Sequence, residues 1–105
     1  MDIDHSPAPS LPDAPGVDLL ELLSDINPGA VRVHVAHLRA GAVLPWHRAG
    51  LDQYFHVLSG EGRAAGDDGV LVSIHPGDTV HWHAGEHHST TADTELTAVI
   101  VQTDL

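Results

Sequence analysis

The chain contains no cysteine, only four lysine and arginine residues, and no long apolar run. The absence of cysteine excludes a disulfide framework, a thiolate metal site and a cysteine nucleophile. No apolar run approaches the roughly 20 residues of a membrane span, and the first residues lack the basic and apolar regions of a signal peptide. We therefore expect a cytoplasmic protein without a membrane partner.

The few basic residues are outnumbered by fifteen acidic ones, which gives a formal net charge of -11. Such a charge repels phosphate backbones, so we expect no nucleic-acid partner. Histidine, in contrast, is abundant, with ten residues in 105. Imidazole is the commonest side-chain metal ligand and titrates near neutral pH, so the histidines are the first candidates for chemistry.

The length of the chain, 105 residues, predicts one compact domain. Residues 1–16 include four prolines, which remove ladder donors, so we interpret this segment as an N-terminal arm or tail and residues 17–105 as the domain. Residues 17–23 fit either one or two helical turns or a short edge strand, and seven residues cannot decide by periodicity; we favour the strand.

Five short runs rich in Val, Ile, Leu and Thr predict strands at residues 31–38, 53–58, 69–74, 79–83 and 96–102. Turn residues bound each run, and the spacing of about ten residues predicts an all-β sandwich or barrel. Alternation places Gln53, Phe55 and Val57 on one face of their strand. It also sets His81 and His83 on the outer face of theirs.

Two stretches, residues 41–60 and 77–88, resemble the paired motifs of the cupin family. The first resembles G-x5-H-x-H-x3-E-x6-G at Gly41, His47 and Gly60, with Ala49 at the second histidine and Gln53 at the acid. The resemblance implies an all-β fold, a small conical double-stranded β-barrel of the jelly-roll type, over about residues 31 to 102. It also implies a divalent metal ion, manganese, iron, zinc or nickel, in the mouth of the barrel.

The second stretch resembles G-x5-P-x-G-x2-H-x3-N at Gly77, Gly85 and His88, but has His83 at the proline and Ala92 at the asparagine. Together the two motifs imply His47 and His88 as metal ligands, which lie 41 positions apart in the sequence. Only the cupin register brings them together.

The spacing from His47 to Gln53 is similar to the H-x-H-x3-Q pattern of a subgroup that includes bacterial manganese hydroxynitrile lyase-like cupins. This resemblance implies Gln53 as a third metal ligand through its amide oxygen. Ala49 departs from the subgroup, so either His34 replaces the missing imidazole or the site holds metal weakly. A further histidine of the subgroup corresponds to Ala98, so we do not predict cyanohydrin cleavage.

The direction of His34 also follows from the resemblance. Cupins usually place inside the barrel the apolar residue three before the opening glycine, here Leu38, which implies that His34 points inward too. His34 is then the candidate catalytic imidazole that moves a proton. The aromatic residues Trp46, Phe55 and Trp82 are candidates for the wall of a substrate pocket, or belong to the core.

The sequence lacks the G-x-S-x-G, phosphate-loop and dinucleotide-binding patterns. We favour a metal-dependent lyase or isomerase that acts on a small oxygen-rich or aromatic molecule by Lewis-acid polarisation with histidine proton transfer. Two alternatives stay open: a noncatalytic cupin that binds or senses a small ligand and has lost its metal, and a structural assembly module. A homodimer is predicted separately, because small β proteins often cover exposed strand edges by pairing.

Overall fold

The computed structural model describes residues 1–10, 12, 13, 15, 18, 20, 22 and 31–103. Four positions of the strand predicted at 17–23, namely 17, 19, 21 and 23, lie outside these residues. Within the described part of the chain, no helix has the length and apolar character needed to cross a membrane.

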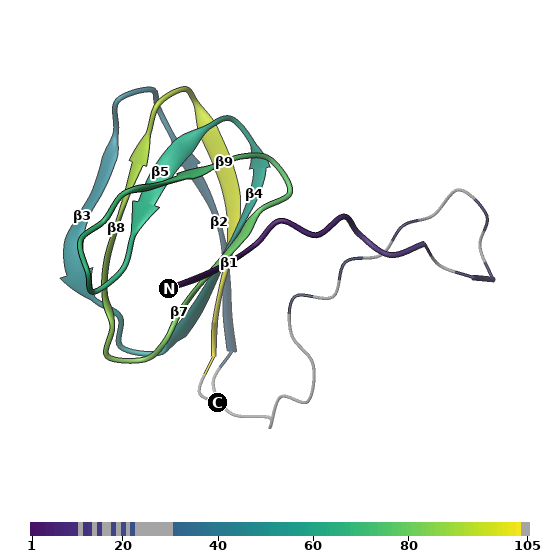
Figure 1. Ribbon diagram of the computed structural model, residues 1–105, viewed down its shortest axis with the longest axis horizontal. Coiled ribbons are helices and arrows are strands. Elements are labelled where there is room, and N and C mark those ends of the chain that lie inside the picture. Colours follow the sequence, from purple (N-terminus) through teal and green to yellow (C-terminus); the bar gives the residue numbers. More distant parts are fainter. Residues whose placement is uncertain are drawn as a thin grey trace.

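The described residues form two antiparallel sheets that face each other (Figure 1), which confirms the all-β prediction. One sheet has the order β1-β7-β4-β9-β2, from β1 (Asp2–Asp4), β7 (Thr79–Trp82), β4 (Asp52–Ser59), β9 (Leu96–Thr103) and β2 (Val31–Leu38). The other has the order β3-β8-β5-β6, from β3 (Val43–Arg48), β8 (His87–Ala92), β5 (Gly62–Ala65) and β6 (Val72–Ile74).

The core lies between the two sheets and follows the predicted alternation. The fully buried apolar side chains of this core include Phe55 and Val57 on β4, Val80 and Trp82 on β7, and Leu96 on β9. Each such side chain contributes about 2 to 3 kcal/mol through its removal from water. The core therefore fixes which side of each strand faces the barrel interior. Polar side chains on the same side of these strands then also point inward.

Four strands were not predicted as such. β5 is short and built from Gly, Arg and Ala, β8 is polar, and β3 is interrupted by Pro45, so none of the three shows the continuous run of Val, Ile, Leu and Thr that marks the predicted strands. The fourth, β1, comes from the proline-rich arm and pairs with β7, so that Asp2 lies opposite His81. After β1 the chain runs away from the barrel (Figure 1).

Two ion pairs attach the N-terminal residues to the barrel. The Met1 amino group lies 2.5 Å from Glu86 Oε2, and His5 Nδ1 lies 2.5 Å from Asp78 Oδ1. Both carboxylates are buried and also accept backbone N–H groups, Asp78 from His75 and Glu86 from His83. The start of the arm is thus part of the barrel wall.

Candidate metal centre

The polar residues singled out in the sequence meet in one pocket of about 180 Å³ between the two sheets. It receives His34 from β2, His47 from β3, Gln53 from β4 and His88 from β8. The other lining residues are Leu44, Ser89, Thr90, Ile100 and Gln102. Strands far apart in sequence therefore build a single polar centre with apolar neighbours.

A β-bulge in β3 turns His47 toward this pocket. Leu44 pairs with Thr90 and His47 pairs with His88, so β3 uses three residues where β8 uses two. A regular strand would place residues 44 and 47 on opposite faces. The extra residue lets both Leu44 and His47 line the pocket.

Pro45, within the bulge, also orients the His47 ring. Its carbonyl oxygen accepts a hydrogen bond from His47 Nδ1 at 2.7 Å. The proton is therefore on Nδ1, and Nε2 presents a lone pair. That Nε2 lies 2.9 Å from Nε2 of His88, within hydrogen-bond distance. Two nitrogens about 2.1 Å from one ion, at a right angle, lie about 3.0 Å apart, so the pair has the spacing of two ligands of one metal.

His88 is held in its neutral form. It is 2% exposed, and its ring makes an edge contact with Trp82, with ring centroids 4.3 Å apart. Burial, together with the nearby His47, lowers the pKa of His88 from 6.5 to about 4. A neutral imidazole is the form that binds a metal ion, so this environment keeps His88 in the protonation state that a metal ligand requires.

Gln53 presents its amide oxygen to the same space. The side chain is buried, and its Oε1 accepts a hydrogen bond from Nε2 of Gln102 at 3.2 Å. An amide oxygen has two lone pairs, so one stays available for a metal. Gln102 thus orients the Gln53 amide toward the pocket, as residues around metal sites orient the ligating side chains.

His34 lines the pocket but is an exposed residue of β2. Among the described residues, three His, Cys, Asp or Glu donors converge to within 4.8 Å only at Asp2, His81 and His83. His34 therefore does not complete a three-histidine set with His47 and His88. Of the two roles considered for His34, this placement favours proton transfer at the pocket rim over metal ligation.

The three aromatic candidates take different places. Phe55 and Trp82 are fully buried and pack edge to face, and Trp82 donates its Nε1–H to the carbonyl oxygen of Ala65 at 3.0 Å. Trp46 is 50% exposed and stacks on His87. The structure places none of the three among the residues that line the pocket. Trp82 acts on the pocket indirectly, as the support of the His88 ring.

Gln102 was not singled out in the sequence, although a signal was present. Along β9, Leu96 and Ala98 are fully buried, and the same face continues to Ile100 and Gln102. A polar residue that continues an inward-facing apolar series at a strand end is a candidate for a site. Ala49, at the position of the usual second histidine, is buried directly after β3.

A family model described as the cupin domain matches residues 34–103, which is more than half of the chain. The chain belongs to the cupin family. The match covers both motif stretches and all four pocket residues that the sequence singled out. No curated protein sequence matches this cupin significantly.

Solved structures agree with the family assignment. An RmlC-like cupin from Shewanella frigidimarina superposes with a TM-score of 0.66 at 19% identity, over 71% of this chain and 67% of the other. A predicted oxalate decarboxylase from Thermotoga maritima gives 0.65 at 28% identity, over 70% and 65%. The DMSP lyase DddQ from Ruegeria pomeroyi gives 0.64 at 26% identity, over 71% of this cupin but only 39% of the lyase.

Proposed function

We propose that this cupin binds a divalent ion, manganese, iron, zinc or nickel, through His47, Gln53 and His88. The observation that carries the proposal is the 2.9 Å separation of the two Nε2 atoms inside a pocket that also holds the Gln53 amide. Two neutral imidazoles and an amide oxygen fit a borderline divalent ion, and they leave coordination positions free for substrate and water. The donor set resembles the H-x-H-x3-Q pattern without its second histidine, whose position Ala49 occupies.

We further propose that the cupin is a lyase or isomerase. When bound, the ion supplies Lewis acidity, which polarises a carbonyl or hydroxyl oxygen. With no carboxylate among the described residues that line the pocket, these donors leave the charge of the ion largely uncompensated, which favours high Lewis acidity. His34 at the rim takes or returns the proton that such a reaction moves. Gln102 keeps Gln53 in place.

The pocket also restricts the substrate. Its volume of about 180 Å³ admits a small molecule, and its walls combine Leu44 and Ile100 with hydroxyl groups of Ser89 and Thr90. No lysine or arginine lines it, and the chain carries a net charge of -11. These features favour a neutral molecule with hydroxyl or carbonyl oxygens, or a small aromatic one, over a dicarboxylate.

Metal analysis of untagged protein tests this function. We expect elemental analysis to find metal in wild-type protein, and His47→Ala and His88→Ala each to lose metal and turnover together. His37→Ala is the matched control, because this exposed histidine lies outside the pocket. Stoichiometric metal with full activity in both pocket variants would refute the proposed function.

One observation supports a second candidate, a noncatalytic cupin that senses a small ligand. Ala49 takes the place of one imidazole, and the described part of the chain contributes no carboxylate to the pocket, which reduces metal affinity. This function predicts that a metabolite raises the melting temperature of metal-free protein without being converted. A screen in which metal-free protein binds nothing would exclude it.

We also propose a homodimer. β2 is the outermost described strand on its side of the five-stranded sheet, while β1 covers the edge of β7. The outer face of β2 exposes Val31, Val33 and Val35 by 42%, 62% and 69%. A row of exposed apolar side chains on an edge strand favours pairing with a second copy of the chain.

A further inference from the structure

A second group of metal-ligand side chains lies on the outside of the barrel. His81 and His83 alternate with the buried Val80 and Trp82 on and just after β7, so both point outward. The pairing of β1 with β7 brings Asp2 opposite His81. The ring centroids of His81 and His83 are 4.3 Å apart, and Asp2 Oδ2 lies 2.9 Å from His83 Nε2. One donor atom from each residue lies within 4.8 Å of the others.

The His81 ring is fixed from two sides. Asp52 Oδ2 lies 3.0 Å from His81 Nε2, and the other oxygen of Asp52 accepts the backbone N–H of Ala84 at 2.9 Å. Tyr54 stacks on the ring, with centroids 4.2 Å apart and an interplanar angle of 10°. A carboxylate on one ring nitrogen and a packed ring face are the features that orient metal-binding histidines.

The two carboxylates of this group are ionised at neutral pH. The hydrogen bond to His83 lowers the pKa of Asp2. Burial acts to raise the pKa of Asp52, but the hydrogen bonds from Ala84 and His81 outweigh it and the pKa is lowered. Negative charge is therefore available next to both imidazoles.

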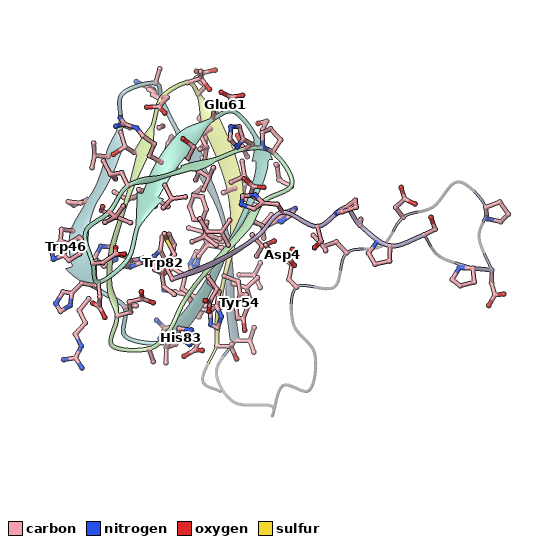
Figure 2. All side chains as sticks on the ribbon, in the orientation of Figure 1. Asp4, Trp46, Tyr54, Glu61, Trp82 and His83 are labelled. Carbon is pink, nitrogen blue, oxygen red and sulfur yellow. The ribbon has the colours of Figure 1, made fainter. Side chains whose placement is uncertain are left out.

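We propose that Asp2, His81 and His83 form a second site for a borderline divalent ion such as Zn²⁺, separate from the barrel pocket and independent of the proposed function. Two imidazoles and one carboxylate are a typical donor set for zinc, nickel or copper. Figure 2 shows His83 and Tyr54 away from Trp46, which extends from the strand that carries His47. No residue of this group lines the barrel pocket.

The outer site joins two parts of the chain. Asp2 belongs to β1, and the histidines belong to β7 and the turn after it, so a shared ion closes β1 onto β7 from outside. A groove of about 250 Å³ lies alongside, lined by Asp2, His81 and Tyr54 together with Leu20 and Leu22. Metal at this site thus stabilises the attachment of the N-terminal arm to the sheet.

The test uses Zn²⁺ on untagged full-length protein that carries His47→Ala and His88→Ala, so that the barrel pocket no longer contributes. Calorimetric titration should show one Zn²⁺ per chain and a rise in melting temperature. Adding His81→Ala and His83→Ala should weaken this binding at least tenfold. The matched control adds His37→Ala and His75→Ala, which removes two exposed histidines outside the site and should leave the affinity unchanged.

Asp2→Asn is a second test that does not depend on the folding of the histidine variant, because the Asp2 side chain is 71% exposed and asparagine has nearly the same shape. This variant should keep the melting temperature of the metal-free protein but lose most of the Zn²⁺-induced rise. Zn²⁺ affinity unchanged by both the double-histidine and the Asp2 variants would overturn the proposal. An equal loss in the His37 and His75 control would overturn it too, since it would show nonspecific binding to surface histidines.

Discussion

His47 lies directly opposite His88 across the β3–β8 ladder, with their Nε2 atoms 2.9 Å apart. The β-bulge at Pro45 and Trp46 produces this alignment, and the carbonyl oxygen of Pro45 selects the tautomer of His47. Gln53 and Gln102 complete the polar side of the pocket from the facing sheet. The following predictions test how this arrangement works.

Gln53→Glu should bind divalent metal at least about tenfold more tightly than wild type, a gain of about 1.4 kcal/mol. A carboxylate of the same shape keeps the hydrogen bond from Gln102 and adds a negative charge toward the ion. Gln53→Ala, which removes the donor, should bind more weakly. Competition with a chelator of known affinity measures both. A Gln53→Glu protein that binds no more tightly than wild type contradicts Gln53 as a ligand.

Metal-free protein should lose stability as the pH falls from about 6.5 to about 4. The fold lowers the pKa of His88 from 6.5 to about 4, so between these pH values the unfolded chain binds more protons than the folded chain. The free energy of unfolding therefore decreases as the pH falls through this range. The full effect is about 3 kcal/mol. Urea unfolding in the presence of chelator measures it.

The variant His88→Gln should remove this slope, while His37→Gln, a change at an exposed histidine, should keep it. Asp52 and Glu86 also have lowered pKa values, but they contribute at lower pH. The stability that these ionised carboxylates provide is lost only as the pH falls below the ordinary pKa of a carboxyl group. A flat stability curve for wild type between pH 4 and 6.5 would show that His88 is not held neutral by the fold.

Trp82 should report metal binding at His88 through its fluorescence. In Trp46→Phe, Trp82 is the single tryptophan left, and its ring lies 4.3 Å from that of His88. Addition of a paramagnetic ion such as Mn²⁺ should quench its emission strongly. The same protein with His88→Gln should show little quenching. Equal quenching in both would place the ion elsewhere.

Gly60→Ala should destabilise the barrel much more than Gly41→Ala. Both glycines have a φ of 83°, but a Cβ at Gly60 would meet the Glu95 carbonyl oxygen at 1.9 Å, whereas Gly41 has nothing within 4 Å. The backbone conformation alone costs about 1 kcal/mol, and the added clash brings Gly60→Ala to about 3 kcal/mol or more. Chemical unfolding of the two variants separates the cost of the backbone conformation, present in both, from the cost of the clash, present only in Gly60→Ala. Equal losses would mean that the loop at Glu95 moves freely.

Val35→Lys should dissociate the proposed dimer. It puts a charge on the exposed apolar face of β2, where Val35 is 69% exposed, and should change the stability of the monomer by less than about 0.5 kcal/mol. Val70→Lys, at a position of similar exposure outside β2, is the control. Light scattering over a range of concentrations measures the mass. A wild-type mass that stays monomeric at all concentrations refutes the dimer.

Much of the barrel could be predicted from the sequence. Alternation correctly grouped Gln53, Phe55 and Val57 on one face, which is buried, and set His81 and His83 on the outer face, because a period of two suffices for regular strands. The motif stretches predicted which polar residues share a pocket. Strands without β-branched residues, such as β5, escaped detection, since they form through pairing with neighbours that are distant in the sequence.

The bulge marks the limit of such reasoning. Alternation from Leu44 would turn Trp46 inward and His47 outward, and the structure has the reverse, with Trp46 exposed and His47 in the pocket. A one-residue bulge leaves no periodic signal in the sequence. Likewise the group of Asp2, His81 and His83 depends on β1, whose pairing with β7 spans almost 80 positions and follows from no local pattern.

The order of the strands also has a consequence for folding. β9 is the common neighbour of β2 and β4, and it carries Gln102 and Ile100 of the pocket. A nascent chain that lacks this last described strand therefore has neither the strand that joins β2 to β4 nor one wall of the pocket. Such long-range pairing makes folding slow relative to helical proteins of this size. Metal binding at the proposed site of His47 and His88 would then be a late event that follows folding of the barrel and does not start it.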